Sequence, residues 1–418
     1  MLKSSLLYKI INGIWDMCFI WKTEMRNVFR DEGVLIFCIL VPLGYPLLYS
    51  WIYNNEVVRE VDTAIVDLSH SHTSREFIRE YDATPDAKAT YYCNSLEEAK
   101  QLVQKQAVHG ILYIPSDFDT RLNRGEQAHV SVYTDMSLML TYKAIYQSAL
   151  AVASHINSGI QITQAGGFTD RDDEITTEPL AFDEVPIFNT TMGYGNAILP
   201  AVLVLILQQT MLLGIGMAAG TSRELNRNRE LIPVSKLYGG IYRIVFGKAL
   251  VYFMVYAVMG MYLTLVVPKL FGFVSMVTWT TILGFLLPYI LSCVFFGLML
   301  SCLVRYRENV MLLVVFTSVP LLFMTGVSWP LSNMPSFWQG FSWVFPSTFG
   351  IRGFLRISSM GASLADILPE FRALWIQTAV YFFATCLVFR QQLRSTRLNA
   401  HLTAEEAEEE DEAETEHK

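Results

Sequence analysis

Histidine and aspartate side chains that could bind a metal ion gather between residues 67 and 135 of the sequence. The histidines are His70, His72, His109 and His129, and the aspartates are Asp67, Asp117, Asp119 and Asp135. His70 and His72 form a His-x-His step, but it falls in an expected loop and no matching pair follows at helical spacing. Polar loop side chains often cap helices and turns, so we assign surface and capping roles to these groups. We predict neither a metal site nor a catalytic centre in this chain.

Polar side chains inside long apolar runs form a second group that could act on another molecule. They are Gln208, Gln209, Thr210, Thr317, Ser318 and Thr325. Such groups are costly in lipid and usually face protein or a cavity, so we take them as candidate contacts for a substrate that crosses the membrane. Hydrogen bonding between helices, worth about 0.6 to 2 kcal/mol per bond, is the alternative role for each of them.

The composition indicates a membrane protein. Of the 418 residues 52% are hydrophobic and 17% are charged, which is too apolar for an ordinary soluble enzyme of this length. The net charge is −8, and the segment from Ala404 to the end accounts for all of it, because nine acids stand there against one lysine. No basic surface for nucleic acid is left. The six cysteines form no C-x-x-C pair, which argues against a zinc ribbon or a disulfide scaffold.

Six apolar stretches are long enough to cross a bilayer, which takes about 20 helical residues. They cover residues 33–53, 196–220, 244–267, 279–303, 309–327 and 374–389. Their interiors contain no Asp, Glu or Arg. Lys248 stands close enough to one end for its ammonium group to reach water.

Basic residues in the short loops predict the orientation of the spans. With the N-terminus inside, sixteen Lys and Arg flank the spans on the cytoplasmic side and four lie on the other side. Both termini are therefore expected in the cytoplasm, and residues 54–195 outside it. Apolar residues at steps of three or four before the first span predict an amphipathic helix along the inner membrane face, with Trp15 and Trp21 at headgroup depth. The apolar stripe is Leu7, Ile10, Ile14, Cys18, Trp21, Met25 and Val28.

The long polar segment reads as a mixed α/β unit, because short β-branched runs alternate in it with amphipathic helical stretches. We expect strands at residues 63–67, 89–93, 110–114 and 129–133. We expect helices at residues 73–81, 96–106, 117–124 and 138–164. The acidic stretch 170–178 is predicted to be an exposed link, and the tail from Ala404 to be disordered by composition.

Three stretches of the chain resemble the permease subunit of a bacterial ABC exporter of the type-2 class. Ile65-Val66-Asp67, Gly110 to Pro115 and Tyr133-Thr134-Asp135 follow the order of that family's large extracytoplasmic loop. Met334-Pro335, followed by Pro346-Ser347-Thr348, resembles its re-entrant outer hairpin. We single out Trp329, Pro330, Met334, Pro335 and Pro346 in this hairpin. The charged loop after residue 220 resembles the coupling helix that touches the ATPase, except that Gly220-Thr221 precedes the first Glu instead of lying between two acids.

The resemblance implies that ATP hydrolysis and transport are carried out by different subunits. The chain has no G-x-x-x-x-G-K-S/T phosphate cradle, so ATP and Mg²⁺ are expected in a separate ABC ATPase, and this chain is expected to hold no cofactor and not to be an enzyme. The predicted docking charges are Arg223, Glu224, Arg227, Arg229 and Glu230, aided by Arg26, Arg30, Asp31 and Glu32. The alternative is that the basic groups only set the topology. In the family the second and fifth spans line the path at a dimer interface.

The expected fold is an α-helical polytopic membrane protein of the bacterial inner membrane, with six transmembrane helices and an inserted α/β extracytoplasmic domain. We divide it into an interfacial helix (1–32), the first span (33–53), the outer domain (54–195), the second span (196–220), a coupling loop (221–243), the third to fifth spans (244–327), an outer re-entrant hairpin (328–370), the sixth span (371–392) and an acidic tail (393–418).

The predicted function is that of the permease subunit of an ATP-driven exporter for an amphipathic or hydrophobic molecule such as a drug, a lipid or an envelope precursor. The expected partners are the ABC ATPase, a second identical or related permease, membrane lipid and a periplasmic adaptor, with no nucleic acid. One alternative is a non-transporting receptor or envelope scaffold that binds through the outer domain. An intramembrane hydrolase ranks third, because the spans lack the paired Asp, or the Ser with His, of such chemistry.

Overall fold

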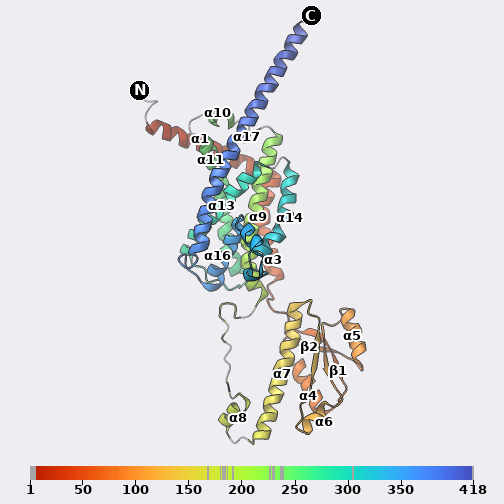
Figure 1. Cartoon of the computed structure of the whole chain (residues 1–418). Helices are drawn as coiled ribbons and strands as arrows, with labels where there is room; N and C mark the ends of the chain where they lie inside the picture. Colours follow the sequence, from red (N-terminus) through yellow and green to blue (C-terminus); the bar gives the residue numbers. More distant parts are fainter. Residues whose placement is uncertain are drawn as a thin grey trace. The chain divides into compact units, whose positions relative to one another are not determined.

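The computed structural model describes residues 6–166, 169–178, 193–225, 231–235, 240–303 and 306–416, together with 180, 185, 187–190 and 227. The chain divides into two compact units (Figure 1). One is a helical unit of residues 1–54 and 188–418, and the other is an α/β unit of residues 55–187.

The helical unit contains the membrane spans. Its helices before the α/β unit are α1 (Leu6–Arg30), α2 (Glu32–Leu35), the π-helical turn η2 (Ile36–Leu40) and α3 (Val41–Ile52). After that unit come α9 (Tyr194–Glu224), α10 (Ile232–Ser235), α11 (Gly240–Met261), the π-helical turn η4 (Tyr262–Val266), α12 (Val267–Leu270), α13 (Trp279–Ser301), α14 (Arg307–Met324), the 3₁₀ turn η5 (Leu331–Asn333), α15 (Ser336–Ser342), α16 (Pro346–Met360) and α17 (Leu368–Glu416).

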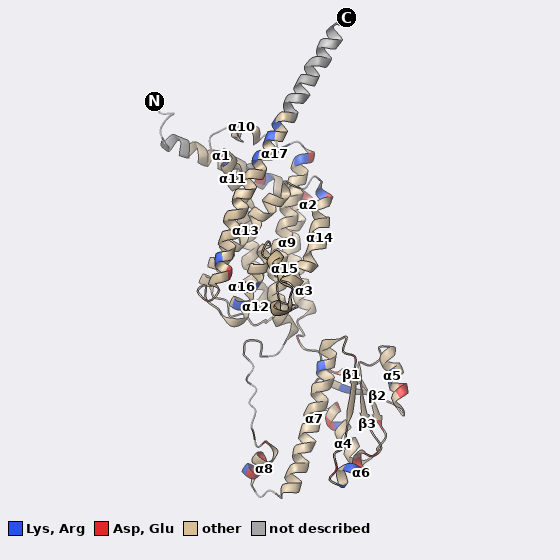
Figure 2. Cartoon of the chain, in the orientation of Figure 1, with Lys and Arg blue, Asp and Glu red and all other residues tan. Residues whose placement is uncertain are grey.

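The six predicted spans are confirmed. Six helical segments of the described chain are long and apolar enough to cross a membrane: Glu32–Ile52, Tyr194–Glu224, Gly240–Leu270, Trp279–Ser301, Arg307–Met324 and Leu368–Leu398. The first and third spans each include a π-helical turn: η2 lies near the start of the first span, and η4 lies near the end of the third. The ribbon segments coloured as Lys, Arg, Asp or Glu lie toward the ends of this bundle, and its middle is almost free of them (Figure 2).

Helix α9 is the central element of the bundle, and it packs against α3, α11, α13, α14 and α16. Most of its side chains are buried, including the run from Leu199 to Leu212. Glycines allow the close approach of neighbouring helices: a Cβ built at Gly216 would lie 2.5 Å from Cγ1 of Val310 on α14. In contrast, α14 exposes a broad apolar face that includes Val315, Phe316 and Val319.

Helix α17 is assigned as far as Glu416, and the disorder expected for the tail from Ala404 stays a prediction. One other expectation about an element is wrong. The acidic stretch 170–178 forms helix α8 (Asp170–Thr177) instead of a link. Thr169 caps this helix by accepting the N–H of Asp172, and acidic side chains in its first turn suit the helix dipole.

The α/β unit is a four-stranded mixed sheet flanked by helices. Its elements are β1 (Val61–Asp67), α4 (His72–Asp82), β2 (Ala87–Tyr92), α5 (Leu96–Gln104), β3 (Gly110–Ile114), α6 (Phe118–Asn123), β4 (Ser131–Thr134), α7 (Met139–Ala165) and α8. The strand order is β2-β1-β3-β4, with β1 parallel to both neighbours and β4 antiparallel to β3. The predicted strands and helices are confirmed to within a few residues.

Alternation along the strands gives this sheet two buried faces. Ile65 and Leu112 join Phe77, from α4, in one core cluster, while Val66 and Ile111 join the other. Two of the aspartates that we considered as metal ligands have capping roles here. Asp67 accepts the N–H groups of Ser69 and His70 and the hydroxyl of Ser74, and Asp135 accepts two bonds from Ser137.

Candidate coupling and transport sites

Asp31 joins three helices at one end of the bundle. Its Oδ1 accepts the N–H groups of Gly33 and Val34 and so caps α2. The same oxygen lies 2.8 Å from a guanidinium nitrogen of Arg307 at the start of α14, and Oδ2 accepts the hydroxyl of Thr221, near the end of α9, at 2.7 Å. Burial opposes ionisation of this carboxyl, but these hydrogen bonds and Arg307 outweigh it and lower the pKa of Asp31 below its usual value. The junction of α1 and α2 is therefore fastened to two spans.

Helix α1 is also fastened to α11, by two ion pairs. Asp16 lies 2.6 Å from Arg243, and Glu24 lies 2.8 Å from Lys248. The expectation that Lys248 reaches water is wrong: the residue is only 8% exposed, because α1 brings a carboxylate to it. Composition alone gave no sign of Glu24, since a single Glu in an amphipathic helix normally faces solvent.

The predicted apolar stripe of α1 is only partly right. The side of α1 that is buried in the bundle consists of Ile20, Glu24 and Val28, whereas Ile14 and Cys18 are exposed. Periodicity finds the apolar side of a helix, but a helix at a membrane surface has two apolar environments, protein and lipid. The exposed apolar side chains, such as Trp15 at 72% exposure, fit the lipid role.

The five predicted docking charges occupy different settings. Arg223 donates to the backbone carbonyl of Cys302, at the end of α13, and is thus used within the chain. Glu224 is exposed. Arg227 is half-buried and lines two neighbouring pockets along α1. Arg229 and Glu230 lie outside the described residues, and of the accessory charges Arg26, Arg30 and Glu32 are exposed.

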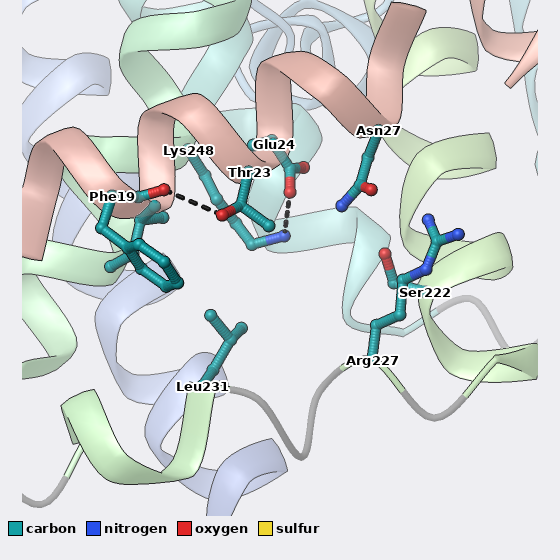
Figure 3. Close-up of a pocket in the computed structure, with 9 residues that line it drawn as sticks. Phe19, Thr23, Glu24, Asn27, Ser222, Arg227, Leu231 and Lys248 are labelled. Atoms are coloured by element: carbon teal, nitrogen blue, oxygen red, sulfur yellow. Dashed lines mark hydrogen bonds and ion pairs between the residues drawn. The ribbon is translucent and has the colours of Figure 1, made fainter. Parts of the chain in front are cut away.

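The two pockets place Ser222, Arg227 and Leu231 beside α1. The first has Phe19, Glu24 and Lys248 on one side and Arg227 and Leu231 on the other (Figure 3). The second is mostly polar and includes Arg30, Asp31, Thr221, Arg227 and Arg307. Charged side chains from the end of α1, from Arg227 after α9 and from the start of α14 thus line the second pocket.

Gln208 and Gln209 are neighbours in sequence but differ in their surroundings. Gln208 is fully buried and bonds to the first turn of α16: its Oε1 accepts the N–H of Ser347 at 2.6 Å and its Nε2 donates to the Ser347 hydroxyl at 3.2 Å. Cys293 also directs its Sγ to this Oε1, at 3.7 Å. Gln209 is only 7% exposed, and both of its amide atoms are buried without a hydrogen-bond partner among the described groups.

The remaining polar candidates bond to their own helices. Thr210 donates to the carbonyl of Ile206, and Thr325 to that of Leu322. Thr317 and Ser318 are half-buried on α14 and do the same with carbonyls one turn back. These hydroxyls therefore have no need of a partner from another helix.

The packing of α9 on α14 brings two of these candidates to one level. Gly220 lies against Arg307, and Gly216 lies against Val310. The two helices therefore run antiparallel, so that rising residue numbers on α14 pair with falling residue numbers on α9. Continued along both helices, this register sets Thr317 level with Gln209. This register predicts that the amide of Gln209 and the hydroxyl of Thr317 lie at about the same depth.

The segment after α14 forms a turn and two helices. Trp329 and Pro330 are exposed, Met334 is half-buried, and Pro335 stands at the start of α15. Pro346 is buried at the first position of α16. Gln339, which the sequence did not single out, closes the turn by donating to the carbonyls of Leu331 and Met334, both at 2.8 Å. Exposed aromatics, among them Phe337 and Trp343, cover its outer side.

The six apolar helices define the chain as a multi-pass helical membrane protein, and the α1 end of its bundle carries a charged surface. Residues 33–387 match the model of the ABC-2 family transporter proteins. Because this match covers most of the chain, the protein belongs to that family and is an ABC transporter permease. No curated protein matches the chain.

Proposed function

We propose that this permease is the membrane subunit of an ATP-driven exporter in the bacterial inner membrane. With a second copy or a close relative, and with two ABC ATPase chains that bind ATP and Mg²⁺, it moves an amphipathic or hydrophobic molecule out of the cell. The observation that carries the proposal is that α1 and its junction with α2 bond to both ends of the charged segment 221–243. Asp31 bonds to Thr221 at its start, and Asp16 pairs with Arg243 at its end.

This fastening suits transmission of force. A partner that pushes on residues 224–236 moves α1. The Asp31–Thr221 hydrogen bond passes that movement to α9, and the ion pairs pass it to α11 and α14. The sequence has no phosphate cradle, so the force originates in another chain. The excess of basic residues in the loops at this end supports a cytoplasmic location for it, and an extracytoplasmic location for the α/β unit.

The interface between α9 and α14 supports a substrate path. Gln209 offers a donor and an acceptor that no described group satisfies. The register of α9 on α14 predicts that Thr317 lies at the same level. A buried amide without partners costs about 1–3 kcal/mol, and a polar group of a bound molecule would recover it. We therefore infer that the substrate combines an apolar body with at least one hydrogen-bonding group, as drugs, lipids and envelope precursors do.

Copurification tests the proposal. The tagged chain is purified from its native host, and the bound proteins are tested for a P-loop ATPase and for ATP hydrolysis in liposomes. Replacement of residues 224–236 by a neutral linker of equal length leaves the packed end of α9 intact. We expect this variant to lose the ATPase. As a control, the same replacement in the acidic helix α8 should leave binding unchanged. ATP hydrolysis that is indifferent to the loop replacement would remove the coupling role.

A further inference from the structure

Glu24 is a buried carboxylate at the contact between α1 and α11. Its side chain is 8% exposed, that of Lys248 is 10% exposed, and the Lys248 ammonium lies 2.8 Å from Oε2 (Figure 3). Tyr252, one turn further along α11, donates its hydroxyl to Oε1 of Glu24 at 3.1 Å. Both carboxylate oxygens are thus held, each by a different side chain of α11.

The backbones of the two helices approach closely beside this pair. A Cβ built at Gly247 would lie 3.0 Å from two side-chain atoms of Ile20, and 3.2 Å from the carbonyl oxygen of Met17. A side chain at position 247 would therefore push α1 away from α11. The ion pair and the glycine together give α1 one defined position on the third span.

Stability alone does not explain a buried ion pair. Removing two charges from water costs several kcal/mol per ion, so a well-packed apolar pair is often as stable or more so. An ion pair differs in being directional, since a shift of α1 along α11 would separate the charges. The loss of one partner, by contrast, leaves a buried charge and costs about 3–5 kcal/mol.

The location of the pair connects it to the charged segment. Glu24 and Lys248 line the same pocket as Arg227 and Leu231, which belong to the segment that we propose to dock on the ATPase. A second pair, Asp16 with Arg243, lies two turns earlier on α1 and is more accessible, with side chains 25% and 19% exposed. The Glu24–Lys248 pair is thus the less solvent-exposed of the two ion pairs between α1 and the third span.

We propose that Glu24 and Lys248 are a positioning pair that passes the movement of α1 into the third span during the transport cycle. The inference rests on the proposed function, because it needs an ATPase that moves α1. Neither residue touches the substrate. Tyr252 keeps the carboxylate oriented. The π-helical turn η4, further along the same span, is where the helix can change its local geometry to accommodate the movement.

Hydrogen exchange in the assembled complex tests the pair. The readout is deuterium uptake of residues 262–270, in η4 and α12, with and without ATP and vanadate, on the full permease with its ATPase in lipid nanodiscs. The variants are Glu24→Gln, Lys248→Met and the apolar double variant Glu24→Leu/Lys248→Met. The double variant leaves no unpaired charge, so it keeps the proposal testable if a single variant fails to fold. Glu60→Gln, in the exposed Lys88–Glu60 pair of the α/β unit, is the matched control.

In the unchanged complex and in the control, we expect nucleotide to change the uptake of residues 262–270. In the double variant the ATPase should stay bound while this response falls at least fivefold. A full response in the double variant would overturn the positioning role and leave the pair a packing contact. Absence of both bound ATPase and nucleotide response in the unchanged protein would instead contradict the proposed function, so the two failures are distinguishable.

Discussion

At the scale of single residues, the two adjacent glutamines of α9 have opposite roles. Gln208 hydrogen-bonds to the first turn of α16: it accepts the N–H of Ser347 and donates to the Ser347 hydroxyl. Gln209 satisfies nothing in the described structure. The first arrangement holds the segment after α14 in place, and the second leaves polar groups available to a ligand.

Replacement of Gln208 by leucine should destabilise the protein. It leaves the N–H and the hydroxyl of Ser347 without their hydrogen-bond partner in an apolar environment, which lowers the free energy of unfolding by about 1–3 kcal/mol. A thermal unfolding curve in detergent should show a lower midpoint, and hydrogen exchange in the first turn of α16 should accelerate. An unchanged midpoint together with unchanged exchange would show that Ser347 does not depend on Gln208.

The same replacement at position 209 should act in the opposite direction on stability. Gln209→Leu removes two unpaired polar atoms from a buried site, so the unfolding midpoint should stay equal or rise. If Gln209 contacts the substrate, uptake of an amphipathic fluorescent dye into inverted vesicles should fall several-fold. Full dye transport in a stable Gln209→Leu protein would exclude this amide from the path.

The sequence could identify these residues only as a set. A polar group in an apolar run is visible in the sequence, and all six candidates were found that way. Which of them bonds to its own helix, to another helix or to nothing depends on the rotation of each helix and on its neighbours. Gln208 and Gln209 show the limit, because no local pattern separates two identical adjacent residues.

At the scale of elements, α1 and α14 both depend on their fit to α9 and α11. Asp31 fastens the end of α1 to the ends of α9 and α14, and Gly216 lets α14 lie close to α9. Helices joined by polar links at their ends can shift as rigid bodies, which a transporter requires.

A valine at position 216 should separate α9 from α14. Its Cβ alone would lie 2.5 Å from a methyl group of Val310, and such overpacking costs about 1–3 kcal/mol. The unfolding midpoint should fall, and Val310→Ala in the same chain should restore part of it. Gly44→Ala is the control, because a Cβ there meets no atom within 4 Å. If Val310→Ala gives no recovery, the two helices do not meet at these residues.

The elements themselves were largely predictable, and the errors have physical causes. Hydropathy located the six spans, and alternation located the four strands. The acidic stretch 170–178 was misassigned because charge was taken as a sign of an open link, while Thr169 starts a helix there. The buried side of α1 was misassigned because protein and lipid both accept apolar side chains. Its carboxylate, Glu24, is buried only because Lys248 of a distant segment meets it.

At the scale of the whole molecule, the proposed dimer accounts for the exposed apolar face of α14. Phe316 is 75% exposed and Val315 is 66% exposed in the single chain, on a helix whose other side packs against α9. In the proposed exporter a second permease covers this face, so that two α9–α14 interfaces enclose the path.

Cysteine cross-linking tests this pairing. Phe316→Cys, with the exposed Cys18 replaced by serine, should form a disulfide-linked dimer on mild oxidation in membranes. Leu387→Cys, on α17, is the control, because Leu387 is similarly exposed at 67% but lies away from α14 in the bundle. Equal cross-linking at both positions would indicate random collision, and none at position 316 would place the second subunit elsewhere.

The sidedness of the chain tests the central claim most directly, because force from an ATPase can reach only the cytoplasmic face. Recognition sites for one specific protease are inserted, in separate chains, after Gly125 in the α/β unit and after the exposed Leu225 in the charged segment. In intact spheroplasts we predict that added protease cuts at the first site, and cuts at the second only after the membrane is permeabilised. Cleavage of both sites in intact spheroplasts, or protection of both, would put the two regions on one side and contradict the account.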